Sequence, residues 1–297
     1  MATRPGTALI LREIRKLERY LNGLKMVPAT DLYRSKVILA LLSKALTVGR
    51  AVCALVDAGF PGEAFGLSRT LTDIYFCVRY IGNKDTESRA ETFAKYDARV
   101  RLEWQNVIHK HFPQKTVPAL DTVVLETAKE FKSKSHWTGH GGQAKLMALE
   151  EDTVEVDAQG QPVKSEFDYD AIYFWTSHFV HVTVDALDGH AGLPGEVFRV
   201  RARIGREKKL GKNALFNTAV FLSKTFVCAL RAMNEEQPRA LEDLYTLTSK
   251  FWPLQVEAFP FALLLSADNG ESVRPFPWND VTNALGCVLH IACSPWN

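Results

Sequence analysis

The residues best suited to acid–base chemistry fall in two stretches of the chain. Arg69 and Asp73 lie four residues apart in a strongly apolar segment, so on a helix they share one face and can pair. His181 and Asp185 have the same spacing in a later aromatic-rich segment, where a carboxylate can raise the basicity of an imidazole. These residues predict a polar site in which Arg69 binds an anion, Asp73 orients it or accepts a proton, and His181 is the general base. The alternative is a structural ion pair that fixes helix register, with histidines bonded to the backbone.

Four histidines raise the question of a metal. His136 and His140 lie in a glycine-rich stretch, and His178 and His181 lie three residues apart further on, which are spacings that zinc accepts. The chain lacks the paired Glu-x-x-His motifs of carboxylate-bridged di-iron bundles, and no cysteine is near these histidines in sequence. A histidine-bound metal enzyme is therefore a second alternative, and no cofactor is expected.

The densest charge feature is the segment 199–212, which holds seven cations and one anion. If its first residues are extended, Arg199, Arg201 and Arg203 point to one side and form a row suited to phosphates, with Arg206 close behind. The alternative is a solvated loop. No phosphate-cradling glycine motif, dinucleotide-binding fingerprint or Gly-x-Ser-x-Gly elbow accompanies the segment. An acidic stretch, 150–170, opposes it with eight acids and one lysine.

Composition bounds the class of protein. The chain has 297 residues with 36 Lys and Arg against 34 Asp and Glu, so a formal charge of +2 excludes a globally basic nucleic-acid binder. A hydrophobic share of 46% suffices for one large core. Five scattered cysteines indicate a reducing compartment, the first residues do not resemble a signal peptide, and the apolar run 259–266 is short of the ~20 residues of a membrane helix. We expect a cytoplasmic protein without membrane partners.

Apolar residues recur at steps of three and four along most of the chain, which predicts an all-α, multi-helix bundle as one domain over 1–297 with a helical C-terminal extension of about 212–297. Two alternating stretches predict a small β-hairpin insertion near 153–167. After Gly189 the chain is expected to be loop-like until Lys212. The expected helices are Thr7 to Gly23, Asp31 (as N-cap) to Gly59, Glu63 to Ile81, Thr86 to His109, Ala119 to Phe131, Asp168 to Asp188, Asn213 to Asn234, Pro238 to Phe251, Val256 to Leu265 and Asn279 to Cys293.

Three stretches together carry a family resemblance: Asp57 to Asp73, Arg79 with the two residues after it, and Tyr173 to His181. They resemble a widespread bacterial family of helical proteins known only as a domain of unknown function, in which an Arg-x-x-x-Glu helix pairs with a later Ser-x-x-x-His helix. The likeness covers roughly Leu39 to His190, within a family-like core of about 31–190. Asp73 stands where the family usually has glutamate, which shortens the reach of the carboxylate.

The resemblance implies an α-helical fold akin to the HEPN (higher eukaryotes and prokaryotes nucleotide-binding) bundles, whose members include RNases of toxin and defence systems. Those RNases carry an arginine and a histidine separated by four to six residues, whereas the nearest match here, Arg101 and His109, has seven between them. A site would have to combine Arg69, Asp73 and His181 across helices. The leading hypothesis is thus an RNA- or nucleotide-binding protein of a toxin or defence system that cleaves RNA without metal. The alternative is a non-catalytic protein-interaction module in a defence or regulatory complex. A homodimer or a protein partner is also expected.

Overall fold

The computed structural model describes residues 5–24, 32–114, 116, 118–131, 136–138, 173, 176–177, 180, 208–235, 238–241 and 243–244. No strand occurs within these ranges, which confirms the all-α prediction at that level. The predicted hairpin near 153–167 and the predicted helices of the last fifty residues lie outside them. The helices are α1 (Pro5–Gly23), α2 (Leu32–Ala58), α3 (Pro61–Asn83), α4 (Thr86–His111), α5 (Thr122–Lys129) and α9 (Lys208–Met233).

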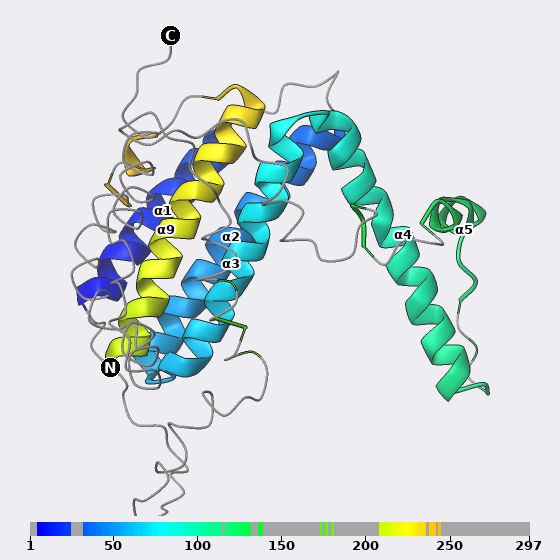
Figure 1. The fold of residues 1–297 in the computed structure, drawn as a ribbon, viewed down its shortest axis with the longest axis horizontal. Coiled ribbons are helices and arrows are strands. Elements are labelled where there is room, and N and C mark those ends of the chain that lie inside the picture. The colour runs from blue at the N-terminus through cyan, green and yellow to red at the C-terminus, as the bar shows by residue number, and fades with distance from the viewer. Residues whose placement is uncertain are drawn as a thin grey trace, which may run out of the picture.

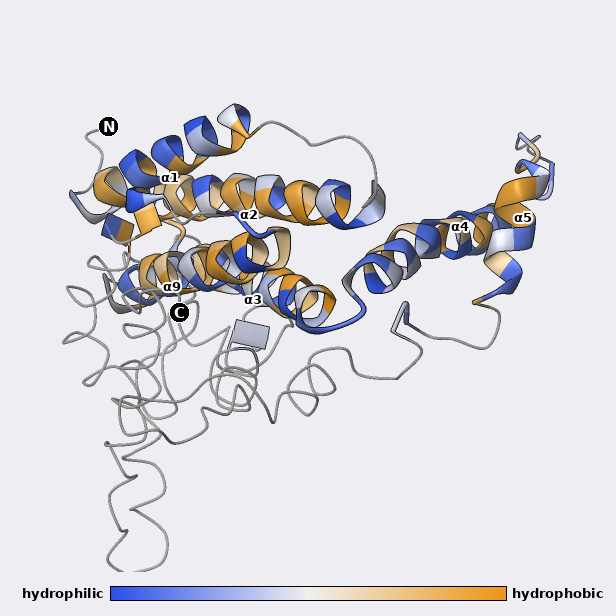
Figure 2. Ribbon diagram, turned by 90° about the horizontal axis from the view of Figure 1, so that it is seen from above, coloured by the Kyte–Doolittle hydropathy of each residue, from blue (hydrophilic) through white to orange (hydrophobic). Residues whose placement is uncertain are grey.

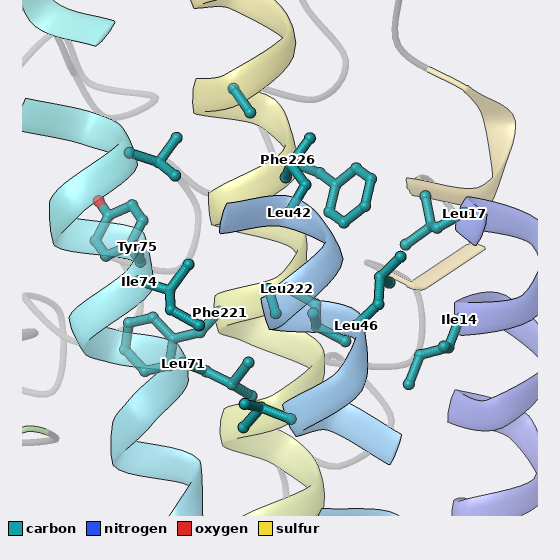
Figure 3. Packing of buried hydrophobic residues seen from close by; sticks show 14 of the residues in the cluster. Ile14, Leu17, Leu42, Leu46, Leu71, Ile74, Tyr75, Phe221, Leu222 and Phe226 are labelled. Carbon is teal, nitrogen blue, oxygen red and sulfur yellow. The ribbon is translucent and has the colours of Figure 1, made fainter. Parts of the chain in front are cut away.

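Four of these helices form a bundle (Figure 1). The most extensive packing joins α3 to α9, which are far apart in sequence; α2 packs against both, and α1 covers α2 and α9. Helix α3, which contains the strongly apolar segment, is buried from Pro61 to Ile81 on most of its circumference. Figure 3 shows Leu71, Ile74 and Tyr75 of α3 beside Phe221 of α9, whereas Leu222 lies near Leu46 of α2. The Tyr75 and Phe221 rings lie 5.7 Å apart and are fully buried.

The turn between α2 and α3 follows directly from its sequence. Gly59 has φ of +89°, in the left-handed region that costs glycine little, and the Phe60 N–H donates to the Leu55 carbonyl at 2.9 Å. Pro61 then begins α3, where its missing N–H leaves no helical bond unmade. This short connection places α2 and α3 side by side.

The predicted loop from Gly189 to Lys212 is wrong at its C-terminal end. Helix α9 begins at Lys208 rather than Asn213, so the last cations of the basic segment belong to a helix. Leu210 explains the earlier start, because it packs against the hydrophobic core and lysine and leucine both favour helix. Core residues from Ala214 to Leu230 then stabilise the same helix.

Helix α4 leaves the bundle as an arm and carries α5 beside its distal half (Figure 1 and Figure 2). Only Ala90 and Ala98 of α4 are buried. At the base of the arm, the buried ring of Trp137 stacks edge-on against Tyr80 at 5.4 Å and Phe93 at 5.1 Å. Near the tip, the Gln105 amide donates to the Pro118 carbonyl at 3.1 Å, which ties the arm to the chain entering α5.

Glu87, in the first turn of α4, caps a different helix. Its two carboxylate oxygens accept the backbone N–H groups of Tyr33 at 2.8 Å and Arg34 at 2.9 Å. These donors belong to the first turn of α2, where N–H groups have no partner within the helix and a negative charge is favoured. The cap predicted from Asp31 lies outside the described residues. Glu87 thus joins the base of the arm to the start of α2.

Two helices are long and apolar enough to cross a membrane by length and composition alone: α2 over Tyr33–Ala58 and α9 over Leu210–Met233. Half of the apolar window of α2 and 83% of that of α9 are buried inside the bundle. The core helices of a globular protein pass the same test, so these two helices are weak support for a membrane location.

We predict that Gly82→Ala destabilises the contact between α3 and α9. A methyl group at Gly82 would lie 2.9 Å from Cβ of Ala232, and that methyl carbon cannot move aside by rotation of a side-chain bond. Overpacking should outweigh the better helix propensity of alanine, lowering the free energy of unfolding by about 1–2 kcal/mol in urea denaturation. The loss should shrink in an Ala232→Gly background. Gly23→Ala is the matched control, because nothing lies within 4 Å of the added methyl; equal losses at both sites would contradict the close approach.

We further predict that Glu87→Ala lowers the free energy of unfolding by about 1–2 kcal/mol, since two N–H groups of α2 lose their acceptor. The comparison is Glu91→Ala on the same helix, which removes only the partly exposed i,i+4 pair with Lys95 at 2.9 Å and should cost less than about 0.5 kcal/mol. Equal effects in urea denaturation would show that the cap has no special weight.

Candidate phosphate-binding site

The side chain of Arg69 joins α3 to a segment more than one hundred residues away. Its Nη2 donates to the Tyr173 hydroxyl at 2.5 Å, and its guanidinium carbon lies 4.4 Å from the centroid of the same ring. The Tyr173 side chain therefore contacts the Arg69 cation both through the face of its ring and through its hydroxyl oxygen. Two of the three stretches that carry the family resemblance, Asp57 to Asp73 and Tyr173 to His181, are therefore in contact through this pair.

The Tyr173 segment is itself held by short local bonds. The hydroxyls of Thr176 and Ser177 donate to the Tyr173 carbonyl at 3.1 and 2.5 Å. All four described residues of the stretch predicted as a helix over Asp168 to Asp188 are helical, and Thr176 is buried. Tyr173 is thus fixed from its backbone side while its ring lies on Arg69.

Asp73 lies one turn after Arg69, but the pair is weaker than its place on an apolar helix predicts. The Asp73 Oδ2 lies 4.0 Å from Arg69 Nε, at the outer limit for an ion pair. Arg69 keeps 20% of its side chain exposed and Asp73 keeps 41%. The short aspartate side chain accounts for the long separation. Arg69 Nε is a buried donor that has no hydrogen-bond partner within the described part of the chain.

Loss of hydration raises the pKa of Asp73 to about 6, although the Arg69 charge acts in the opposite direction. Although 41% of the Asp73 side chain is exposed, the Arg69 charge at 4.0 Å is too far away to offset the lost hydration of the buried part. A carboxyl that titrates near pH 6 can exchange protons at neutral pH.

The rotation of α3, and with it the side on which Arg69 lies, is fixed by polar groups of the core. The Ser68 hydroxyl is fully buried, donates to the Phe65 carbonyl at 2.6 Å and accepts from the Asn217 amide of α9 at 3.3 Å. Turning α3 would break this link between helices and leave buried polar groups unpaired. Ser68 therefore faces α9 while the next residue, Arg69, lies at the edge of the bundle.

The other predicted site residues divide into two groups. His136 is described, and its Nδ1 lies 3.0 Å from the Thr138 hydroxyl and accepts the Thr138 backbone N–H at 3.3 Å. Within the described ranges no three His, Cys, Asp or Glu side chains gather closely enough to hold a metal. The remaining candidates lie outside those ranges, so their roles stay predictions: His140, His178, His181, Asp185, Arg199, Arg201, Arg203 and Arg206.

Tyr173 is the site residue to which the sequence argument gave no role. Aromatic residues are common in apolar helices, so its type alone does not distinguish it from a core residue. Its place at the start of the stretch that resembles the family, three residues before Thr176, was the available signal. The residue that pairs with an arginine from another helix cannot be read from spacing along one helix.

The pKa of Asp73 predicts a specific pH dependence of stability. Because this pKa is higher in the folded chain than its ordinary 3.8, the folded state binds more protons between about pH 4 and 6. Ionising Asp73 therefore lowers the free energy of unfolding as the pH rises through that window. We expect Asp73→Asn to become progressively more favourable relative to wild type from pH 4 to pH 7 in urea denaturation. A difference that stays constant or moves the other way would contradict the raised pKa.

Comparison with protein families gives one match, a model described as a family of unknown function (DUF5677), over residues 35–196. Searches of curated proteins and of solved structures find no match. The matched range covers more than half of the chain and includes Arg69, Asp73 and Tyr173. The resemblance inferred from the residues is thereby confirmed at the level of a domain of unknown function. The chain belongs to the DUF5677 family.

Proposed function

We propose that the protein binds the phosphate groups of RNA at Arg69 and cleaves the RNA without a metal ion. The observation that carries the proposal is the coupling of a fixed, partly exposed arginine to a carboxyl whose pKa is raised to about 6. An arginine offers five N–H donors, and Tyr173 occupies only part of that set. Because 20% of the Arg69 side chain is exposed, donors of its guanidinium other than the one bonded to Tyr173 can meet the oxygens of a phosphodiester.

A structural ion pair accounts for these features less well. Such a pair gains stability from short, well-aligned bonds, whereas Asp73 lies 4.0 Å from Arg69 and keeps 41% of its side chain in contact with solvent. Arg69 is held firmly by Tyr173 instead, which leaves the Asp73 carboxyl near the cation without neutralising it. This separation leaves room for an anion to approach both groups from the solvent side.

The reaction that fits these groups is transesterification within the RNA strand. The 2′-oxygen attacks the adjacent phosphorus and its proton passes to His181 as the base. The bond from phosphorus to the 5′-oxygen breaks, and that oxygen takes a proton from the acid form of Asp73. The products are a 2′,3′-cyclic phosphate and a free 5′-hydroxyl, with Arg69 stabilising the charge on the phosphoryl oxygens. Arg199, Arg201, Arg203 and Arg206 would hold neighbouring phosphates.

A HEPN-like bundle and a role in a toxin or defence system belong to the same proposal. So does a cytoplasmic location, for which the odd number and scattered positions of the five cysteines are the support. The support for the fold relationship is the all-α bundle and the contact between the Arg69 helix and the Tyr173 segment.

We predict that the purified chain cleaves RNA in the presence of EDTA and that Arg69→Ala, Asp73→Asn and His181→Ala each slow cleavage by about 10²- to 10⁴-fold. Arg101→Ala is the matched control, because Arg101 is an exposed arginine of α4 paired with Asp97 at 2.6 Å. The rate should also fall as the pH rises above about 6, where Asp73 loses its proton. Absence of wild-type cleavage across RNAs of varied sequence and structure would refute the nuclease, and equal slowing by Arg101→Ala would refute the site.

A second candidate, a non-catalytic module that binds proteins, is favoured by one observation, the exposed apolar residues of the α4 arm. Under this function Arg69→Ala would lower the melting temperature without affecting any reaction, and no RNA cleavage would be found.

A further inference from the structure

We propose that the distal half of α4 is a self-association surface, through which two copies of the chain pair their arms in antiparallel orientation. The inference does not depend on the proposed RNA chemistry. It starts from an apolar stripe in which Val100, Trp104 and Val107 are 48%, 64% and 45% exposed. Isolated exposed apolar residues are ordinary, but three in one row on a projecting helix are not.

The spacing of the stripe is that of a coiled-coil seam. Val100, Trp104, Val107 and His111 follow one another at steps of four, three and four residues, and Phe93 and Asp97 continue the row toward the bundle. Phe93 is already engaged by Trp137 at the base of the arm. The seam is therefore occupied where the arm meets the bundle and open from Val100 outward.

The stripe lies on the free side of the arm. The side of α4 that faces the chain leading into α5 holds the buried Ala98 and Gln105, which bonds to the Pro118 carbonyl at 3.1 Å. At 3.6 residues per turn, Trp104 lies about 100° around the helix from Gln105, and Val100 and Val107 lie about 140° and 160° from it. Helix α5 therefore stiffens the arm without covering the stripe, and Figure 2 shows the two helices projecting together from the bundle.

The flanking charges select a second copy as the partner and set the register. In an antiparallel pair whose twofold axis passes between residues 105 and 106, Trp104 meets Val107 of the second copy and Val100 meets His111. Glu103 then lies opposite Lys110 of the second copy, and symmetry repeats that pair on the other side. A parallel pair would instead place Glu103 near Ile108 and leave both charges without a complement.

In the monomer, the charges of Glu103 and Lys110 are accessible to a second copy. Lys110 has no ion pair within the described part of the chain, and Glu103, with 52% of its side chain exposed, is bonded only along its own helix to Arg99 at 2.7 Å. The register also keeps the bundles apart. Phe93 of the second copy would lie opposite chain positions beyond His111, where α4 has ended, so each bundle sits past the tip of the other arm.

We expect the full-length protein to show a concentration-dependent equilibrium between monomer and dimer in sedimentation velocity. Glu103→Lys and Lys110→Glu should each raise the dimer dissociation constant about tenfold or more, because like charges then face each other twice. The double variant Glu103→Lys with Lys110→Glu should restore it to near the wild-type value. Trp104→Ala should abolish the dimer.

Two controls separate the stripe from general effects. Val123→Ala removes an apolar side chain that is 71% exposed on α5, and Asn106→Glu adds a charge on the exposed side of α4 away from the stripe; neither should change the equilibrium. Unchanged circular dichroism and melting temperature confirm that each variant is folded. At about 100 µM even a small interface should convert a detectable fraction of the protein to dimer. A wild-type protein that is still monomeric at that concentration would overturn the proposal. So would a dimer that survives Trp104→Ala, or a double charge variant that fails to recover.

Discussion

The packing of α3 against α9 is the constraint on which the rest of the molecule depends. These helices approach so closely that Gly82 has no space for a methyl group beside Ala232, and Ser68 must share a hydrogen bond with Asn217 across the contact. A helix buried on most of its circumference has only a narrow edge on which charged side chains can lie. Arg69 and Asp73 lie on that edge, so the packing of the core sets where these two side chains are placed.

The arrangement also explains why the two charged groups differ in environment. Arg69 reaches outward to Tyr173, which supplies a ring face and a hydroxyl, and so it keeps a defined position. Asp73 is too short to reach the same partner closely, and its pKa responds to the apolar wall behind it more than to the cation in front. A guanidinium held by an aromatic ring thus lies beside a carboxyl whose pKa is about 6.

Local patterns predicted the helices well, because burial of an apolar stripe decides where a helix persists. The ends of α1 to α4 fall within two residues of the expected ones, whereas α5 is shorter at its start and α9 begins earlier because Leu210 reaches the core. Contacts between residues far apart in the sequence could not be predicted from these patterns. Nothing near Glu87 indicates that it caps α2, and nothing near Arg69 indicates that Tyr173 lies against it. Such contacts depend on how helices are placed together, which periodicity along one helix does not encode.

The cap that Glu87 provides has a mechanical consequence. Helix α4 is anchored at its first turn to the first turn of α2, while its distal half extends away from the bundle. Helix α4 also follows α3 directly along the chain, and the Arg89 guanidinium donates to the Tyr80 carbonyl of α3 at 2.6 Å. A force applied at the tip of the arm is therefore shared between α2 and α3 at the base of the arm.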